Sequence, residues 1–325
     1  MSRHDLDEQL TKYLTDAHCI EEQALTQMRS APKLAGDDGI AQAFARHEAE
    51  TAGHERTIRD RLTARGASPA TVKDLVGRVS GQGFALFARL QPDTPGKLVS
   101  HAFSYEHLEL AAYELLADVA ERAGDEPTLT VAREIRGEEE AMGARLETMF
   151  DRAVDAALDA SSSGEPGRHV IRYLADAHGL ESQSIQLLRC AQPMAGPPEL
   201  AEVYGEHLAQ SSRQAQRLEE RLRALGGAPS RVKDVALGLG ALNWGLFFLL
   251  QPDTPPKLAA FAYAYEHLEI AGYELLARVA ARAGDGPTES LAREIAGEER
   301  SAAEKIHARL GRAMEHSLRS RGLIA

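Results

Sequence analysis

The sequence is poor in cysteine and in aromatic residues, and each shortage argues against a class of protein. Only two of the 325 residues are cysteines. Cys19 and Cys190 fall at unrelated positions within helical patterns, so we expect no disulfide framework and favour a reducing, cytoplasmic setting. Aromatic residues make up only 5% of the chain, which is unfavourable for a protein built from β-strands.

Long apolar runs and basic blocks are also missing. The closest approach to a membrane segment is the uncharged run VALGLGALNWGLFFLL at 235–250, which is shorter than the roughly 20 residues needed to span a bilayer. We interpret it, with its counterpart at 75–90, as a buried or interface helix. The first residues, MSRHDLDEQLTKYL, lack the apolar core of a signal peptide. A net charge of -12 argues against a nucleic-acid partner.

The residues that dominate the chain are those that favour long amphipathic helices. Hydrophobic residues make up 43% of the sequence and charged residues 26%. Alanine, leucine, glutamate and arginine, the commonest types, are all strong helix formers. A chain of this length corresponds to about two domains at about 100 to 200 residues each. The sequence therefore predicts an all-α protein with two domains.

An internal repeat of 160 residues divides the chain. The string YLTDAHCIEEQ at 13–23 returns as YLADAHGLESQ at 173–183, and QPDTP and YEHLE recur at the same offset. Such similarity at one fixed spacing indicates gene duplication. We predict a first domain at 1–159, a linker at 160–168 with the composition ASSSGEPGR, and a second domain at 169–325.

Breaker residues divide each copy into similar helices. In the first copy we expect helices at 5–30, 37–65, 95–124 and 127–157, with a short apolar helix at 71–90 between the second and the third. Four long helices with one long connection in the middle are typical of ferritin-like bundles. The fold prediction is two tandem ferritin-like four-helix bundles.

Several acidic and histidine side chains fall on the apolar faces of these helices. Glu21 lies in line with Leu14, Ala17, Leu25 and Met28. In the second helix the apolar face includes two histidines with a glutamate between them, and in the third and fourth helices two glutamates each border the core face. The resulting candidate metal ligands are Glu21, His47, Glu50, His54, Glu106, Glu109, Glu138 and Glu139.

Buried carboxylates repel one another and lose hydration, so something must compensate them. A carboxylate from each of four helices, with histidine on one of them, is the ligand set that holds two iron or manganese ions in bundle cores. The alternative is an ion-pair and hydrogen-bond network in which Arg133, Arg136 and tyrosine hydroxyls neutralise the acids, or simple exposure to solvent.

The string EHLELAAYELL, a later Gly-Glu-Glu and the pattern His-x-x-Glu-Thr at 47–51 resemble the YciF-type ferritin-like family, which is linked to bacterial stress responses. The resemblance covers each copy almost end to end. It implies a rubrerythrin-like bundle, dimer formation and a di-iron centre, without a firmly assigned reaction. It would place ligands at Glu21, at Glu50, at Glu106 or Glu109, and at Glu138 or Glu139. Family members usually have one domain, so the two copies would form an intramolecular pseudo-dimer, and a homo-oligomer is also compatible.

The second copy departs from the first at two candidate ligands. Glu181, His207, Glu266, Glu269, Glu298 and Glu299 are retained, whereas Gln210 and Gln214 replace Glu50 and His54. Glutamine is a neutral and weaker ligand, so we expect the second bundle to hold fewer ions than the first.

Three functions are compatible with these features. The first is a non-haem centre of two iron ions, or manganese, in the first bundle, with stress-related oxygen, peroxide or iron chemistry and Glu50 as the bridging ligand; a di-iron oxidoreductase is one form of it. The second is a non-catalytic scaffold or binding protein whose metal site has decayed. The third, a substrate oxygenase or desaturase-like enzyme, requires an apolar channel that a sequence does not reveal. We expect neither nucleic acid nor membrane as a partner.

Overall fold

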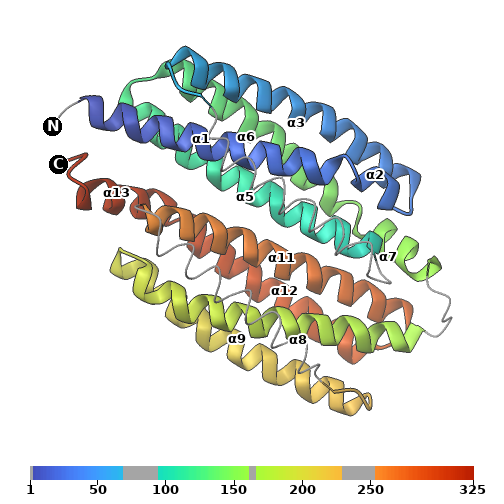
Figure 1. The fold of residues 1–325 in the computed structure, drawn as a ribbon. Coiled ribbons are helices and arrows are strands. Elements are labelled where there is room, and N and C mark those ends of the chain that lie inside the picture. The colour runs from blue at the N-terminus through green and yellow to red at the C-terminus, as the bar shows by residue number, and fades with distance from the viewer. Residues whose placement is uncertain (1–2, 69–93, 161–165, 229–252) are drawn as a thin grey trace. The chain divides into compact units, whose positions relative to one another are not determined.

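The computed structural model describes residues 3–68, 94–160, 166–228 and 253–325, and every regular element within these ranges is helical (Figure 1). The chain divides into two compact units, Met1–Ser162 and Ser163–Ala325. The predicted fold class, all-α with two tandem bundles, is therefore confirmed. The apolar segments expected at 75–90 and 235–250 lie outside the described residues.

The first unit is a bundle of four long helices. Helix α1 contacts α3 and α5, and α6 contacts the same two helices, so that the four form a closed ring around one core. The short helix α2 connects α1 to α3, and α7 packs against α5. The helices of this unit are α1 (Arg3–Met28), α2 (Ala31–Leu34), α3 (Asp38–Ala64), α5 (Thr94–Ala123), α6 (Glu126–Glu147) and α7 (Phe150–Asp159).

Local signals fix the ends of these helices close to the expected positions. The side chain of Asp37 accepts a hydrogen bond from the backbone N–H of Ile40 and caps α3. After α5 the chain turns at Gly124, whose φ of 69° is a conformation that glycine adopts without strain. Asp125 then caps α6 by accepting from the N–H of Thr128. This turn makes α5 and α6 antiparallel neighbours.

The inward faces predicted from periodicity form the core. Leu14, Ala17, Glu21, Leu25 and Met28 of α1 are all buried. The inward face of α3 is buried as well, at Ile40, Phe44, His47, His54, Ile58 and Leu62. Polar candidate residues and apolar core residues therefore share the interior of the bundle, which positions the charged groups away from water.

The expected fourth helix is interrupted, which corrects the prediction of one continuous helix over 127–157. Helix α6 ends at Glu147 and α7 begins at Phe150. The Thr148 hydroxyl donates to the carbonyl of Arg145 at 2.7 Å. Phe150 is fully buried and packs edge-on against Phe103 of α5, with 5.4 Å between ring centroids. The break between α6 and α7 coincides with the burial of the Phe150 ring. Neither glycine nor proline marks the break in the sequence.

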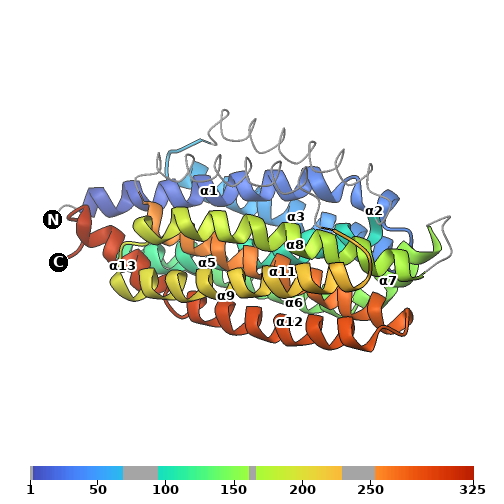
Figure 2. The same ribbon diagram turned by 90° about the horizontal axis from the view of Figure 1, so that it is seen from below.

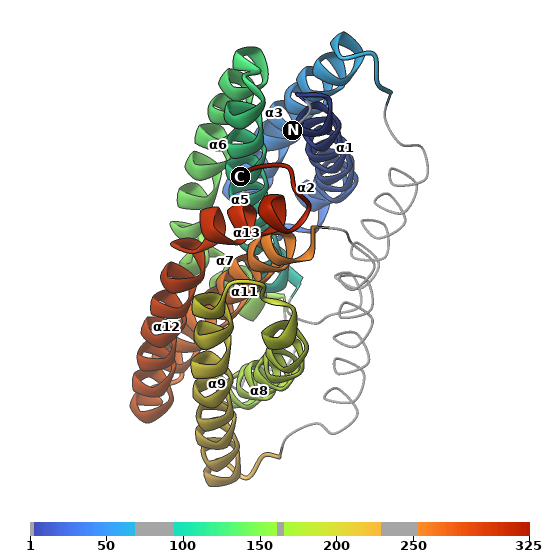
Figure 3. The same cartoon turned by 90° about the vertical axis from the view of Figure 1, so that its left-hand side faces the viewer.

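The second unit repeats the order of long helices of the first. Helix α8 contacts α9 and α11, and α12 contacts α9 and α11 (Figures 2 and 3). Helix α8 begins at Pro166, inside the stretch expected as a linker. The elements of this unit are α8 (Pro166–Ala191), η1 (Gln192–Met194), α9 (Pro198–Ala224), α11 (Thr254–Arg282), α12 (Gly286–His307) and α13 (Leu310–Ser320).

Two further expectations concern cysteine and membranes. Neither Cys19 nor Cys190 forms a disulfide bond. Among the described helices, none combines the length and the apolar character that crossing a membrane would take.

Candidate metal centre

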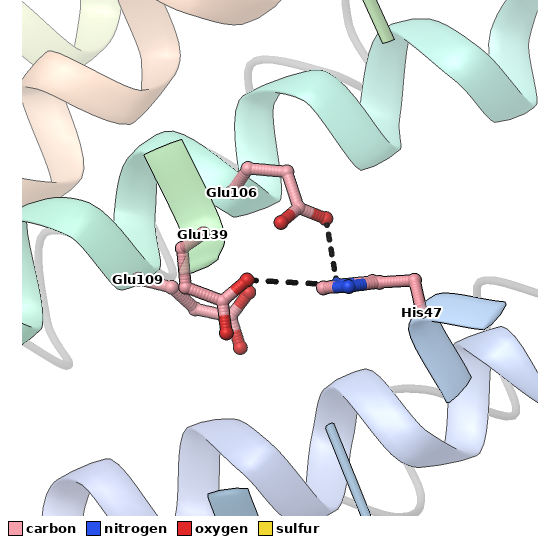
Figure 4. A group of neighbouring side chains, drawn as sticks. All are labelled: His47, Glu106, Glu109 and Glu139. Atoms are coloured by element: carbon pink, nitrogen blue, oxygen red, sulfur yellow. Dashed lines mark ion pairs between the residues drawn. The ribbon is translucent and has the colours of Figure 1, made fainter. Parts of the chain in front are cut away.

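Four buried side chains meet in the core of the first bundle. His47 comes from α3, Glu106 and Glu109 from α5, and Glu139 from α6, and one ligand atom of each lies within 4.8 Å of the others (Figure 4). Nε2 of His47 is 3.3 Å from Oε1 of Glu106 and 3.6 Å from Oε2 of Glu139. We call these residues the first group.

A second group adjoins the first and shares Glu139 with it. It consists of Glu21 on α1, His54 on α3 and Glu139, again with ligand atoms within 4.8 Å of one another. Nδ1 of His54 is 2.8 Å from Oε1 of Glu139 and 3.8 Å from Oε1 of Glu21. The Tyr113 hydroxyl of α5 donates a hydrogen bond to Glu21. The two groups therefore form one centre with contributions from all four long helices.

Many polar atoms of this centre have no hydrogen-bond partner among the described residues. Both carboxylate oxygens of Glu109 are in this state, as are both of Glu139 and one each of Glu21 and Glu106. Buried polar atoms in proteins are nearly always satisfied, because an unmade hydrogen bond costs about 1–3 kcal/mol. Unpaired oxygens converging from three helices, next to two histidines of the fourth, fit divalent cations, which take oxygen and imidazole ligands.

Electrostatics in the metal-free centre oppose ionisation of most of its acids. Burial raises the pKa of Glu109 well above its usual range, and the neighbouring carboxylates of Glu139 and Glu21 add to the shift. Burial also dominates the rise in the pKa of Glu21 to about 8. Although burial works against it, the ion pair with His54 and the charge of His47 hold the pKa of Glu139 below its usual range. Without a cation, the centre therefore retains protons.

The histidines of the centre carry raised pKa values for the opposite reason. Burial lowers the pKa of His47, but the charges of Glu106 and Glu139 outweigh burial and raise that pKa to about 10. In the same way Glu139 and Glu21 raise the pKa of His54 to about 9 against the effect of burial. Both imidazoles therefore act as the internal counter-charges of the metal-free acids.

Two of the predicted ligands lie outside both groups and contact the far side of the histidine rings. Oε2 of Glu50 is 3.3 Å from Nδ1 of His47, and its side chain is 34% exposed. Oε2 of Glu138 is 2.7 Å from Nε2 of His54, and its side chain is 60% exposed. A carboxylate on the second ring nitrogen orients a metal-binding histidine and fixes its tautomer. The structure thus brings together six of the eight predicted residues and places Glu50 and Glu138 behind the histidines.

The arginines considered as neutralising partners do not contact the acids of the centre in the described part of the chain. Arg133 pairs with Glu121, with 3.8 Å between the charged atoms. Arg136 pairs with Glu114 at 3.6 Å. Within the described residues, the part of the alternative network that reaches the acids of the centre is the tyrosine hydrogen bond to Glu21.

A third group contains none of the residues predicted as ligands from the sequence. It comprises His18 and Glu22 of α1 and Glu55 of α3. Nε2 of His18 is 3.0 Å from Oε1 of Glu55, which Arg59 also contacts at 3.0 Å. The i, i+4 spacing of His18 and Glu22 was the signal in the sequence that could have identified it.

The second unit repeats the first group completely. His207 on α9, Glu266 and Glu269 on α11, and Glu299 on α12 are all buried, with ligand atoms within 4.8 Å of one another. Nε2 of His207 is 2.8 Å from Oε2 of Glu266 and 3.4 Å from Oε2 of Glu299. The second group is not repeated there, since Gln214 occupies the position of His54.

The four-helix bundles and their buried clusters of glutamate and histidine define a ferritin-like protein with candidate metal sites. The sequence model of one family, described as a domain of unknown function (DUF892), matches residues 5–159 and again residues 167–319. The chain therefore belongs to this family, which is the YciF-like ferritin-like superfamily, and carries its domain in two tandem copies. No curated protein and no solved structure matches the chain.

Proposed function

We propose that the first bundle is a non-haem centre for two divalent cations, iron or manganese. The observation that carries this proposal is the position of Glu139, which belongs to both buried groups at once. One ion would be held by His47, Glu106, Glu109 and Glu139, and the other by Glu21, His54 and Glu139. The bridging role expected of Glu50 passes to Glu139, and Glu50 and Glu138 become orienting carboxylates.

Charge balance supports two ions rather than one. The four buried carboxylates Glu21, Glu106, Glu109 and Glu139 supply four negative charges when ionised, and two divalent cations supply four positive charges. The cations would replace the protons that the metal-free centre retains, and the histidines would then bind as neutral imidazoles.

Iron bound at such a centre supplies redox chemistry toward dioxygen or peroxide, or a place to hold iron. The chain itself contributes burial, which excludes bulk water, and the Tyr113 hydroxyl, which donates to Glu21. A stress-related role in oxygen, peroxide or iron chemistry follows from the family resemblance, and a di-iron oxidoreductase is the enzymatic form of the proposal. The second candidate function is a non-catalytic scaffold, favoured by the loss of the histidine ligand at Gln214 in the second unit.

Metal content of the full chain decides between these functions. The protein is purified without added metal, loaded with Fe²⁺ without oxygen or with Mn²⁺, desalted and analysed for metal. A loss of about two bound ions in Glu139→Gln, with no loss in Glu140→Gln, supports the centre, because Glu140 is the exposed neighbour on the same helix. Retention that is equal in both variants, or absent from the unaltered protein, leaves the scaffold function.

We also propose that the tandem copies stand in for a dimer of single-domain chains, in a cytoplasmic protein. The double match to one family domain supports this assembly. Light scattering on the purified protein is expected to give the mass of one chain, 35.2 kDa. A stable species of twice that mass would instead indicate a homo-oligomer.

A further inference from the structure

The second bundle holds a complete set of ligands for a single ion. His207, Glu266, Glu269 and Glu299 come from three helices, and none of their side chains is more than 2% exposed. Among the described residues neither oxygen of Glu269 has a hydrogen-bond partner, and Oε2 of both Glu266 and Glu299 is in the same state. A fully buried carboxylate without a hydrogen-bond partner among the described residues, within 4.8 Å of a histidine and two further acids, is suited to binding a divalent cation.

Gln214 closes the place that a second ion would need. Its amide nitrogen donates to Oε1 of Glu299 at 2.5 Å and to Oε2 of Glu298 at 2.8 Å. In the first bundle the equivalent carboxylate, Glu139, offers Oε1 to His54 instead. To bind a cation through its oxygen, the amide of Gln214 would have to turn over and give up both hydrogen bonds.

Glu181, the remaining acid beside Gln214 and Glu299, is also held in place by a hydrogen bond within the protein. Glu181, the counterpart of Glu21, accepts a hydrogen bond from the Tyr273 hydroxyl. Without an imidazole at position 214, no nitrogen ligand joins Glu181 and Glu299. The second unit therefore retains one of the two ligand groups and fills the other with hydrogen bonds.

We propose that the second bundle binds one divalent cation through His207, Glu266, Glu269 and Glu299, and that Gln214 excludes a second ion. The chain would then hold a two-ion centre in its first bundle and a single-ion centre in its second, and the exchange of His54 for Gln214 would account for the difference in ion number. The proposal rests on the proposed function for its class of metal, which is iron or manganese. A single ion with carboxylate-rich ligands lacks a redox partner beside it, so we assign it binding or structural stabilisation.

The test uses reciprocal exchanges at positions 54 and 214 in the full chain, with Mn²⁺ as the probe. Bound metal is counted by elemental analysis, and electron paramagnetic resonance distinguishes an isolated Mn²⁺, with its hyperfine-split signal, from a coupled pair. The unaltered protein is expected to bind about three Mn²⁺ and to show both signals, given a two-ion centre in one bundle. Gln214→His is expected to add one ion and remove the isolated signal, and His54→Gln to remove one ion and strengthen the isolated signal.

Loss of the isolated signal in His207→Ala, with the pair signal unchanged, completes the expected pattern. Each readout is a difference from the unaltered protein, so ions bound elsewhere cancel. A second bundle that binds two ions without alteration, or an isolated signal that survives in both His207→Ala and Gln214→His, overturns the inference. If the isolated signal depends on His207 but no pair signal is seen, the proposed function of the first bundle fails and the single-ion site stands.

Discussion

His54 and Glu139 face each other in the first bundle, with Nδ1 of the imidazole 2.8 Å from Oε1 of the carboxylate. The second oxygen of Glu139 points toward His47, at 3.6 Å. One side chain thereby joins two groups of ligands that would otherwise be separate. The carboxylate is fully buried.

Removal of the shared carboxylate is expected to affect both metal positions. In Glu139→Gln the affinity of the first bundle for Mn²⁺ should fall by more than about a hundredfold, beyond the effect typical of an outer partner. Competition with a fluorescent chelator measures this change. Glu140→Gln on the same helix serves as the control and should bind as the unaltered protein does. Equal affinities in the two variants would show that Glu139 is not a ligand.

Glu50 is expected to tune affinity without setting the number of ions. Its carboxylate contacts the ring nitrogen of His47 that points away from the group. Glu50→Gln should therefore weaken binding by about 10–100-fold, as alterations of orienting partners do. At saturating Mn²⁺ the count of bound ions should remain unchanged. A loss of ions at saturation would restore Glu50 to the bridging role expected from the sequence.

The stability of the metal-free protein is expected to fall as pH rises. The pKa of Glu21 and that of Glu106 are raised from 4.5 to about 8, mainly by burial. The pKa values of His47 and His54 are raised from 6.5 to about 10 and about 9, since their acidic neighbours outweigh burial. A raised pKa contributes stability that is present below the unfolded value and lost as pH rises through the folded value. The loss should therefore extend from about pH 4.5 to about pH 10.

Thermal unfolding of chelator-treated protein at pH 5.5 and pH 8.5 tests this expectation. The melting temperature should be lower at pH 8.5 in the metal-free protein. Saturation with Mn²⁺ should restore it at pH 8.5 more than at pH 5.5, because metal binding must displace protons. A metal-free melting temperature that is higher at pH 8.5 would contradict the protonation pattern.

Asp125 is expected to stabilise the turn between α5 and α6 through its cap and through arginine contacts. Its carboxylate accepts from the N–H of Thr128 at 3.0 Å and from Arg61 at 2.9 Å. Asp125→Ala should cost about 1–2 kcal/mol in the free energy of unfolding. Asp125→Asn keeps a capping oxygen and should cost less. Denaturant titrations of both variants give the comparison, and equal costs would assign the effect to charge rather than to the cap.

We also expect the stabilising effect of the Asp125 carboxylate to depend on pH. Burial opposes the shift, but hydrogen bonds from Thr128 and the charges of Arg61 and Arg65 lower the pKa of Asp125 below 3.8. A lowered pKa contributes stability that is present above the unfolded value and lost as pH falls through the folded value. The gap between unaltered protein and Asp125→Asn should therefore close below about pH 4, as measured by denaturant titration at several pH values.

Periodicity predicted which faces are buried because a helix places residues three and four apart on one side. Glu21, His47 and His54 lie in register with leucines and isoleucines, and all of them are buried. Glu138 and Glu139 are adjacent, and both border the seam, so spacing alone did not decide between them. The packing of α6 against α3 and α5 decides it, burying Glu139 and leaving Glu138 exposed.

The roles within the site depend on distances that no linear pattern contains. Glu50 lies between two buried histidines of α3 in the sequence, which suggested a bridge. The helix turns its side chain toward Nδ1 of His47 and away from the interior. The interruption after Glu147 was missed for a similar reason, since it coincides with tertiary burial of Phe150 and not with a local breaker.

The ligands of the first bundle are spread along the chain from Glu21 to Glu139, one helix after another. Ions that bind all four helices at once would close a chain segment of about a hundred residues into a loop, and crosslinks of that span remove much of the entropy of an unfolded chain. Disulfides do this in many small secreted domains, whereas neither cysteine of this protein forms one. Its crosslink would be ionic, made and released by the supply of metal and protons.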